Sequence, residues 1–243
     1  MCYSAEVQAD LEKLMERFQA EISGADDVYF QELRKKGKNF QFLKEALHLP
    51  KAPRSNFFKV PASDNRIFPG YFTWVMVHEN GRRVFKRMRY RVRPAGSTEE
   101  IPVKYNVFNA RIDSLESRQT WQKLFTRQHG LFPFVRFFEW VEEDGKKRLV
   151  SFLPEKKEIM WAPCLWDYWE NPEKTLGFYS FALITDDPPP EGPNVDTIVA
   201  RFSLRRGTSM SGPLPIKGAG KSGISSLKTK KTSFTVLNGP PES

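Results

Sequence analysis

The sequence has few residues of the kinds that bind metals or form disulfides. It holds two cysteines, Cys2 and Cys164, no Cys-x-x-Cys pair, and three scattered histidines, His48, His78 and His129. A structural zinc site needs four clustered ligands, and a disulfide framework needs paired cysteines in an oxidising compartment. We therefore expect free thiols in a reducing compartment, no metal site and no cofactor.

Long apolar runs and a secretory signal are also missing. No stretch approaches the roughly 20 apolar residues that a helix needs to span a bilayer, and no basic region followed by an apolar core opens the chain. The 243 residues suffice for one domain plus a tail. The sequence predicts a cytoplasmic protein with no membrane partner, and we expect a monomer.

Positive charge is concentrated in the last fifth of the chain. Residues 192–243 hold eight Lys or Arg against two acids, which accounts for 6 of the net +9. This segment is rich in Gly, Ser, Lys and Pro and shows little apolar periodicity, so we expect a largely disordered basic tail. The domain would then cover residues 1–191. A basic balance favours an anionic partner such as nucleic acid.

Apolar spacing predicts three helices near the N-terminus. Residues 4–22 repeat apolar side chains every three or four positions, with Ser4 as the expected N-cap. We expect a second helix over 26–35, with Val28 and Leu33 facing inward, and a third over 39–48. A fourth helical face lies within 114–125, at Leu115, Trp121, Leu124 and Phe125.

The remainder of the body has strand character. Runs of aromatic and β-branched residues flank Asn80-Gly81 and Asp144-Gly145, and such dipeptides are strong hairpin signals. Residues 158–169 and 175–185 read as two more strands. The expected fold class is α+β, mostly antiparallel β with a few helices.

Cys2 stands where removal of Met1 would make it the first residue. A small residue near a terminus is often merely tolerated. The alternative is chemical, because a freed amine beside a thiol is a 1,2-aminothiol, and both groups are partly nucleophilic near neutrality. This pair condenses with an aldehyde, the amine giving an imine and the thiol closing a thiazolidine ring.

Three further residues are candidates for a site. Asn109 and Arg111 precede a helical segment, where a loop Asn and a surface Arg are the ordinary interpretation. Glu139 lies in the aromatic run "VRFFEW". If it faces inward, burial would raise its pKa, as general acid–base catalysis requires. If it faces solvent, it is an ordinary strand residue, and the apolar residues on both sides leave its direction open.

Together, and in this order, these residues resemble a known family. The Met-Cys start, "NAR" at 109–111, "FFEW" at 137–140 and "SFALITDDPPPE" are similar to the SRAP family, the SOS-response-associated peptidases or abasic-site processing proteins. "MCYSA", "MRYRVRPAG", "YNVFNAR" and "CLWDYW" resemble one branch of it. The resemblance covers about residues 1–191. It implies a distorted antiparallel β-barrel with flanking helices, and covalent capture of abasic sites in single-stranded DNA in the bacterial cytoplasm, near the nucleoid.

The resemblance also implies roles. Cys2 would be the nucleophile, Asn109 would orient the cysteine amine or the opened sugar, and Glu139 would be the acid–base group. Arg111 would hold a phosphate near the lesion. Trp140 would stack on a base or fill the core, and core filling is the commoner role of a strand tryptophan.

The sequence departs from the family pattern at two places in its front part. Tyr3 and Ser4 stand where members often have Gly-Arg, whose arginine contacts phosphate. A segment that commonly carries a DNA-stacking tryptophan reads "YRVRPAG" here, and we expect Arg91 and Arg93 to compensate through charge.

Other functional classes stay open at this stage. A cysteine peptidase or amidohydrolase could process its own N-terminus. A protein that has lost catalysis could still bind single-stranded DNA. Salt-sensitive binding without a covalent adduct would favour the last of these.

The family's Gly-His-Asp-Arg-x-Pro motif is missing after "DDPPPE", and no histidine follows His129. Codons for residues 195–203 can be chosen so that the frame starting at their third base encodes Gly-His-Asp-Arg-Cys-Pro-Ile-Phe. We therefore predict a frameshift near Glu191 or Gly192, in the gene or in its sequencing. With the tail as written, capture would be slower. Sequencing the gene tests this; an alternative frame without His-Asp-Arg would instead indicate a natural, divergent basic tail.

Overall fold

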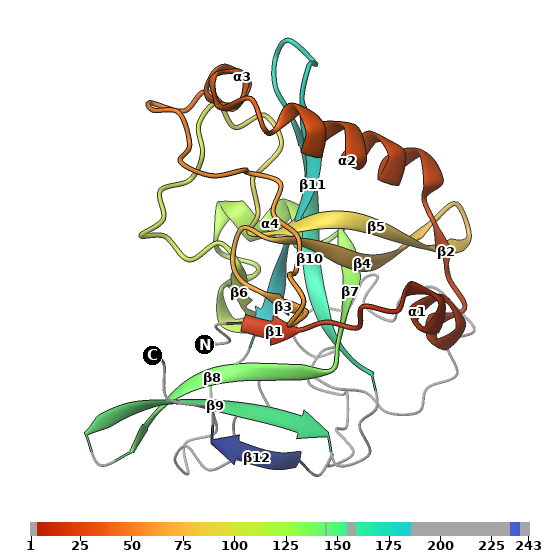
Figure 1. Cartoon of the computed structure of the whole chain (residues 1–243), viewed down its shortest axis with the longest axis vertical. Helices are drawn as coiled ribbons and strands as arrows, with labels where there is room; N and C mark the ends of the chain where they lie inside the picture. The colour runs from red at the N-terminus through yellow and green to blue at the C-terminus, as the bar shows by residue number, and fades with distance from the viewer. Residues whose placement is uncertain (1–3, 144, 155–158, 186–233, 239–243) are drawn as a thin grey trace.

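A computed structural model describes residues 4–143, 145–154, 159–185 and 234–238 (Figure 1). Its helical elements are α1 (Leu11–Phe18), α2 (Gly24–Lys36), α3 (Phe40–Ala46), the 3-10 turn η1 (Ile112–Ser114) and α4 (Gln119–Phe125). The structure confirms the expected α+β class. None of the described helices is both long and apolar enough to cross a membrane.

A closed barrel forms the centre of the fold. Its strands are β4 (Phe72–Glu79), β5 (Arg82–Tyr90), β7 (His129–Phe134), β10 (Met160–Glu170) and β11 (Gly177–Thr185). Four neighbouring pairs are antiparallel, and β11 closes the ring by pairing parallel to β5, with Phe181 opposite Tyr90. The barrel is therefore mixed, whereas the family resemblance implied an antiparallel one. Two short strands, β2 (Glu21–Ile22) and β6 (Asn109–Arg111), add parallel to β5 and β11.

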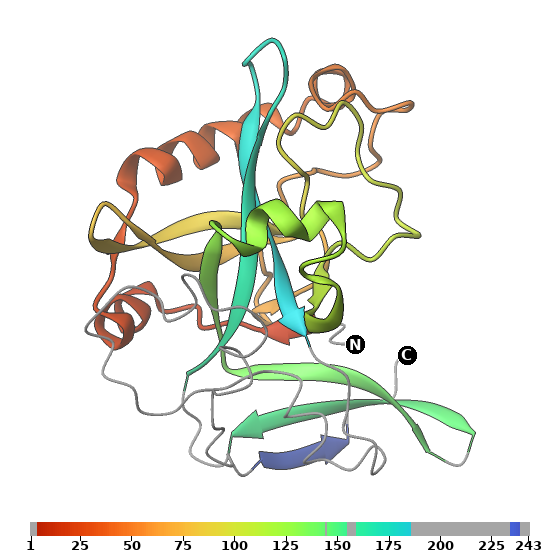
Figure 2. The ribbon, with the colours of Figure 1, turned by 180° about the vertical axis from the view of Figure 1, so that it is seen from behind.

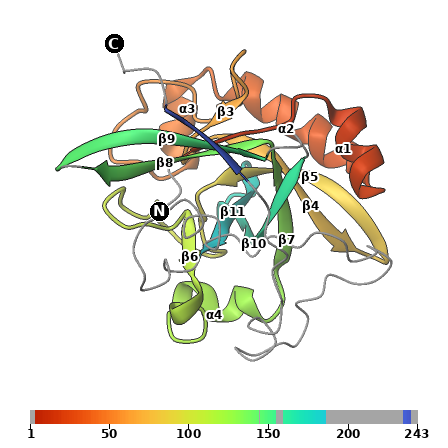
Figure 3. The ribbon, with the colours of Figure 1, turned by 90° about the horizontal axis from the view of Figure 1, so that it is seen from below.

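A second sheet packs against one end of the barrel. Its order is β12 (Phe234–Asn238), β9 (Lys146–Pro154), β8 (Arg136–Glu143), β1 (Ser4–Glu6) and β3 (Arg66–Ile67). Figures 1 and 3 show β8 and β9 as a layer across that end. Strand β12 lies within the predicted disordered tail, so the prediction is wrong for residues 234–238, which pair antiparallel with β9. Residues 186–233 and 239–243 lie outside the described part of the chain.

Both predicted hairpins are confirmed. Strands β4 and β5 are joined by Asn80 and Gly81, whose φ angles are 50° and 78°. Positive φ at both central residues gives the turn the twist that matches its strands, and glycine adopts it without steric cost. Strands β8 and β9 pair in the same manner up to Glu143 opposite Lys146.

The helix predicted over 4–22 is shorter than expected. Residues Ser4–Glu6 form β1 instead, pairing with both β8 and β3, so Ser4 is not an N-cap. Helix α1 begins only after Asp10, whose side chain accepts a hydrogen bond from the Lys13 N–H. The second and third helices are confirmed, and so is the inward position of Leu33, but Val28 is 67% exposed because α2 buries Phe30 in its place. Behind the barrel, α4 packs on β10 (Figure 2).

A row of aromatic rings links the barrel to the second sheet. Tyr90 stacks parallel to Phe132, which stacks on Phe134 at 5.6 Å between centroids. Phe134 meets Phe137 of β8 edge to face, and Phe137 stacks on Phe152 of β9 at 4.6 Å. All five rings are buried, and each such pair contributes about 0.5–1.5 kcal/mol beyond area burial. The row therefore fixes β8 against the barrel.

Three buried arginines surround one carboxylate at the other side of the barrel. Glu100 accepts a two-pronged hydrogen bond from Arg89 at 2.7 and 3.1 Å and lies 3.5 Å from both Arg91 and Arg93. Burial opposes ionisation of Glu100, but the charges of the arginines and the hydrogen bonds from Arg89 outweigh it and lower the pKa of this carboxyl. The cluster ties the loop that carries Glu100 to strand β5.

We predict that Glu100→Gln destabilises the fold by about 3 kcal/mol, because it leaves three buried cations without their counter-charge. The lowered pKa means that Glu100 stabilises the fold above its unfolded value of 4.5 and that this contribution is lost as pH falls through the lower folded value. Denaturant unfolding measured across acidic pH should show both effects. The exposed neighbour variant Glu99→Gln should show neither; equal losses in the two variants would contradict the role of Glu100.

Candidate functional site

Glu139 faces the interior of the molecule. It lies on β8 opposite Val150, two residues beyond Phe137, and its exposed fraction is 5%. Alternate residues of a strand share a face, so the same face that buries Phe137 in the aromatic row also buries Glu139. The structure thus settles the direction that strand alternation left open. The Glu139 carboxyl is therefore largely screened from water on the face of β8 that also buries Phe137.

Asn109 is held at the same end of the barrel. It is the first residue of β6, pairs with Leu183 of β11 and is 4% exposed. The Tyr90 hydroxyl donates a hydrogen bond to Asn109 Oδ1 at 3.4 Å, and Asn106 Oδ1 accepts one from the Asn109 N–H at 3.0 Å. These contacts fix the side-chain amide from one side and the backbone from the other.

The two buried polar residues have neighbours in the same apolar cluster. Leu183, the strand partner of Asn109, belongs to the same core cluster as Ala5 of β1 and Phe137 of β8. Strand β1 is hydrogen-bonded to β8, and Figure 1 shows β6 toward the same end of the barrel. The candidate site is therefore assigned to the barrel end that carries β6, β1 and β8. Cys2 and Tyr3 lie outside the described residues, so the predicted nucleophile is not placed.

Arg111 and Trp140 reach the surface near this end. Arg111 ends β6, its side chain is 46% exposed, and its guanidinium binds both carboxylate oxygens of Asp113, at 2.7 and 3.2 Å. Trp140 is 38% exposed, because it lies on the face of β8 opposite Glu139. The preference for a core-filling Trp140 was therefore wrong.

The burial of Arg91 and Arg93 disagrees with their predicted role in DNA binding. Arg91 is 8% exposed and donates to two backbone carbonyls, those of Ile101 and Pro102. Arg93 is fully buried, donates to the Leu47 carbonyl and lies 3.5 Å above the centre of the Trp169 ring. The sequence showed the charges of Arg91 and Arg93 but not that both pair with Glu100. Glu100 lies on the loop that follows them, and this pairing holds both arginines in the core.

Sequence reasoning missed two residues at this site, Tyr90 and Arg66. Tyr90 contacts Asn109. Its position in the motif "MRYRVRPAG" was a sequence signal that could have identified it as a site residue. The Arg66 Nε donates to Ser4 Oγ at 2.9 Å, and its guanidinium lies 4.0 Å from the centre of the Phe138 ring. No local pattern marks Arg66, because its neighbours come from the pairing of β3 with β1.

Cys164 is a small residue of the core with a free thiol. It is fully buried on β10, and burial raises the pKa of its thiol, which makes it a poor nucleophile. His129 is also buried, and burial lowers the pKa of its imidazole. Within the described ranges, no group of three or more His, Cys, Asp or Glu could hold a metal ion.

Comparison with solved structures places the fold among known ones. A protein from Bordetella bronchiseptica superposes with a TM-score of 0.64 at 14% identity, covering 98% of this chain and 100% of the other. A protein from Bacteroides thetaiotaomicron gives 0.62 at 14% identity, with 98% and 92% covered. At these identities the likeness concerns the fold alone. A search of curated proteins found no match.

The mixed barrel has a second sheet across one end, and it contains one buried carboxyl, Glu139, and one buried amide, Asn109, which together define an α+β protein with a candidate polar site. A family model described as SOS response associated peptidase (SRAP) matches residues 1–201. The chain belongs to the SRAP family, as the resemblance of its motifs predicted. The match extends ten residues beyond the segment on which that resemblance was based.

We predict that Tyr90→Phe lowers the free energy of unfolding by about 1 kcal/mol, since it removes a buried hydrogen bond to Asn109 but keeps the ring. Tyr71→Phe is the matched control, because Tyr71 packs against the same cluster and no hydrogen bond of its hydroxyl is found within the described residues. Chemical denaturation measures both. Equal stability of the two variants would contradict an anchoring role for the Tyr90 hydroxyl.

Proposed function

We propose that this protein captures abasic sites in single-stranded DNA through a thiazolidine formed by Cys2 after removal of Met1. The observation that carries the proposal is the burial of Glu139 and Asn109 at the barrel end where β1 begins. Cys2 precedes Ser4 by two residues, so the chain keeps the two Cα atoms within about 7 Å of each other. Membership of a family named for the SOS response supports a role in DNA damage.

The chemistry balances without a cofactor. The opened sugar of an abasic site carries an aldehyde, and the Cys2 amine attacks its carbon to give an imine with loss of one water. The thiol then adds across the C=N bond, which closes the ring and returns the proton to nitrogen. Glu139 would transfer protons during ring opening and dehydration, and Asn109 would orient the amine or the sugar hydroxyl by hydrogen bonding.

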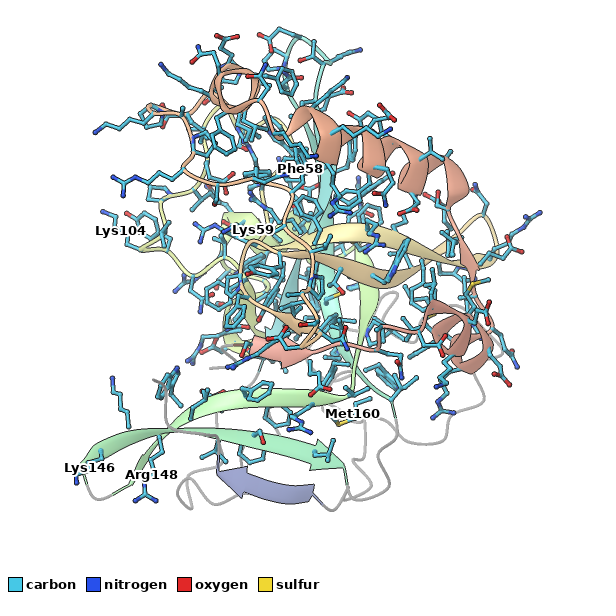
Figure 4. All side chains as sticks on the ribbon, viewed as in Figure 1. Phe58, Lys59, Lys104, Lys146, Arg148 and Met160 are labelled. Carbon is cyan, nitrogen blue, oxygen red and sulfur yellow. The ribbon has the colours of Figure 1, made fainter. Side chains whose placement is uncertain are left out.

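Surface residues of this region suit a single-stranded partner. Trp140 offers an exposed ring on which a base can stack, a contact worth about 1–3 kcal/mol. Arg111 can exchange Asp113 for a backbone phosphate, a contact that carries no sequence information. Figure 4 shows Lys146 and Arg148 on the part of the β8–β9 hairpin that projects beyond the barrel, and Lys104 on a loop of the same side.

Incubation with a single-stranded oligonucleotide that contains one abasic site should give a denaturant-resistant adduct. Its intact mass should equal that of the protein without Met1 plus the DNA less one water. Cys2→Ala should abolish the adduct, whereas Cys164→Ala, the matched loss of a thiol, should retain it. Glu139→Gln should slow its formation by about 10²-fold, and Asn109→Ala should also slow it.

An adduct that survives Cys2→Ala would refute the proposal. Salt-sensitive binding of the same oligonucleotide without any adduct would indicate a binding protein that lacks catalysis.

A further inference from the structure

Arg66 occupies an unusual place at the edge of the second sheet. Its Nε donates to Ser4 Oγ at 2.9 Å, and its guanidinium lies 4.0 Å from the Phe138 ring centre and 5.0 Å from that of Phe68. Two rings and one hydroxyl therefore hold the group in a fixed orientation. Such restraint lowers the entropy that a long side chain loses when it binds a ligand.

Strand register shows which residues share a face with Arg66. Directly opposed residues of paired strands lie on the same side of a sheet, and Glu6 is opposite both Arg66 and Arg136, while Ser4 is opposite Phe138. Trp140 follows Phe138 by two residues and lies on that side too. The face that exposes Trp140 therefore also carries the guanidinium of Arg66.

The hydrogen-bonding capacity of Arg66 is largely unused. A guanidinium has five N–H donors, yet Arg66 Nη2 is buried without a hydrogen-bond partner, and no ion pair of Arg66 is found within the described residues. Glu6, which lies opposite Arg66 in the sheet, pairs with Arg136 at 3.2 Å, and Asp64 accepts a hydrogen bond from the Arg66 backbone N–H at 3.1 Å. The N–H donors of Nη1 also make no hydrogen bond that is found within the described residues, so an acceptor oxygen would find unused donors on this guanidinium.

We propose that Arg66 binds a backbone phosphate of single-stranded DNA beside the nucleotide that Cys2 captures. This inference rests on the proposed function and adds a phosphate-binding residue to it. A guanidinium matches the geometry of a phosphate through paired N–H donors. Ser4, which contacts Arg66, is two residues from Cys2, so the bound phosphate belongs to the lesion or an immediate neighbour. Arg66 acts in binding and does not touch the reacting atoms.

Binding of an undamaged single-stranded oligonucleotide, followed by fluorescence anisotropy at several NaCl concentrations, tests the assignment. Arg66→Gln should weaken binding at low salt about tenfold and reduce the slope of log K against log salt by about 0.7, the value for one phosphate contact on a single strand. Arg66→Lys should keep the slope and recover part of the affinity, because it retains the charge but loses the paired donors. Arg82→Gln is the matched control, since Arg82 is an exposed arginine on the β4–β5 hairpin.

With an abasic oligonucleotide, Arg66→Gln should raise the half-saturating DNA concentration and leave the rate of adduct formation at saturation unchanged. A slope equal to that of the unmodified protein, in Arg66→Gln or in a folded Arg66→Ala, would overturn the inference. A fall in thermal stability with an unchanged slope would also overturn it, as a purely structural role. If the unmodified protein forms no adduct but the slope still changes, covalent capture fails while phosphate binding by Arg66 stands.

Discussion

The site depends on the aromatic row that runs from Tyr90 through Phe132, Phe134 and Phe137 to Phe152. At one end the row presents the Tyr90 hydroxyl to Asn109. Toward the other end of the row, Phe137 packs between Phe134 of the barrel and Phe152 of β9. This packing sets the position of Glu139, two residues further along β8. A single apolar contact series therefore locates both buried polar groups, although they lie thirty residues apart and on different sheets.

Much of the fold could be predicted from local sequence signals. The predictions that were wrong concern segments whose structure depends on pairing with residues far away in the chain. The turn chemistry of Asn80-Gly81 predicted one hairpin, and apolar spacing predicted α2 and α3. Ser4–Glu6 also fits a helical pattern, but two partner strands override that propensity. The parallel closure of β11 on β5 joins residues about ninety positions apart, and no local pattern carries such a pairing.

The same distinction applies to the site. Asn109 and Glu139 were recognisable from their motifs, whereas their burial depends on packing. The exposure of Trp140 follows once Phe137 is known to face inward, because neighbours on a strand point to opposite faces. The pairing of β1 with β8 fixes that choice, since a shift by one residue would exchange the buried and exposed sets. Burial of Ala5 beside Phe137 opposes such a shift.

The arginines of this protein differ in role because their side chains have different partners, and exposure alone does not distinguish them. Arg93 is wholly buried, but a carboxylate, backbone carbonyls and an aromatic ring account for its charge and most of its donors, so it stabilises the fold. Arg66 is less buried, yet it has a hydroxyl and two rings and, within the described chain, no counter-charge. A guanidinium that is held in one orientation but has no carboxylate partner can still bind an anion. That difference is why we propose the phosphate contact for Arg66 of β3, beside Ser4, and not for the arginines of β5 and the segment after it.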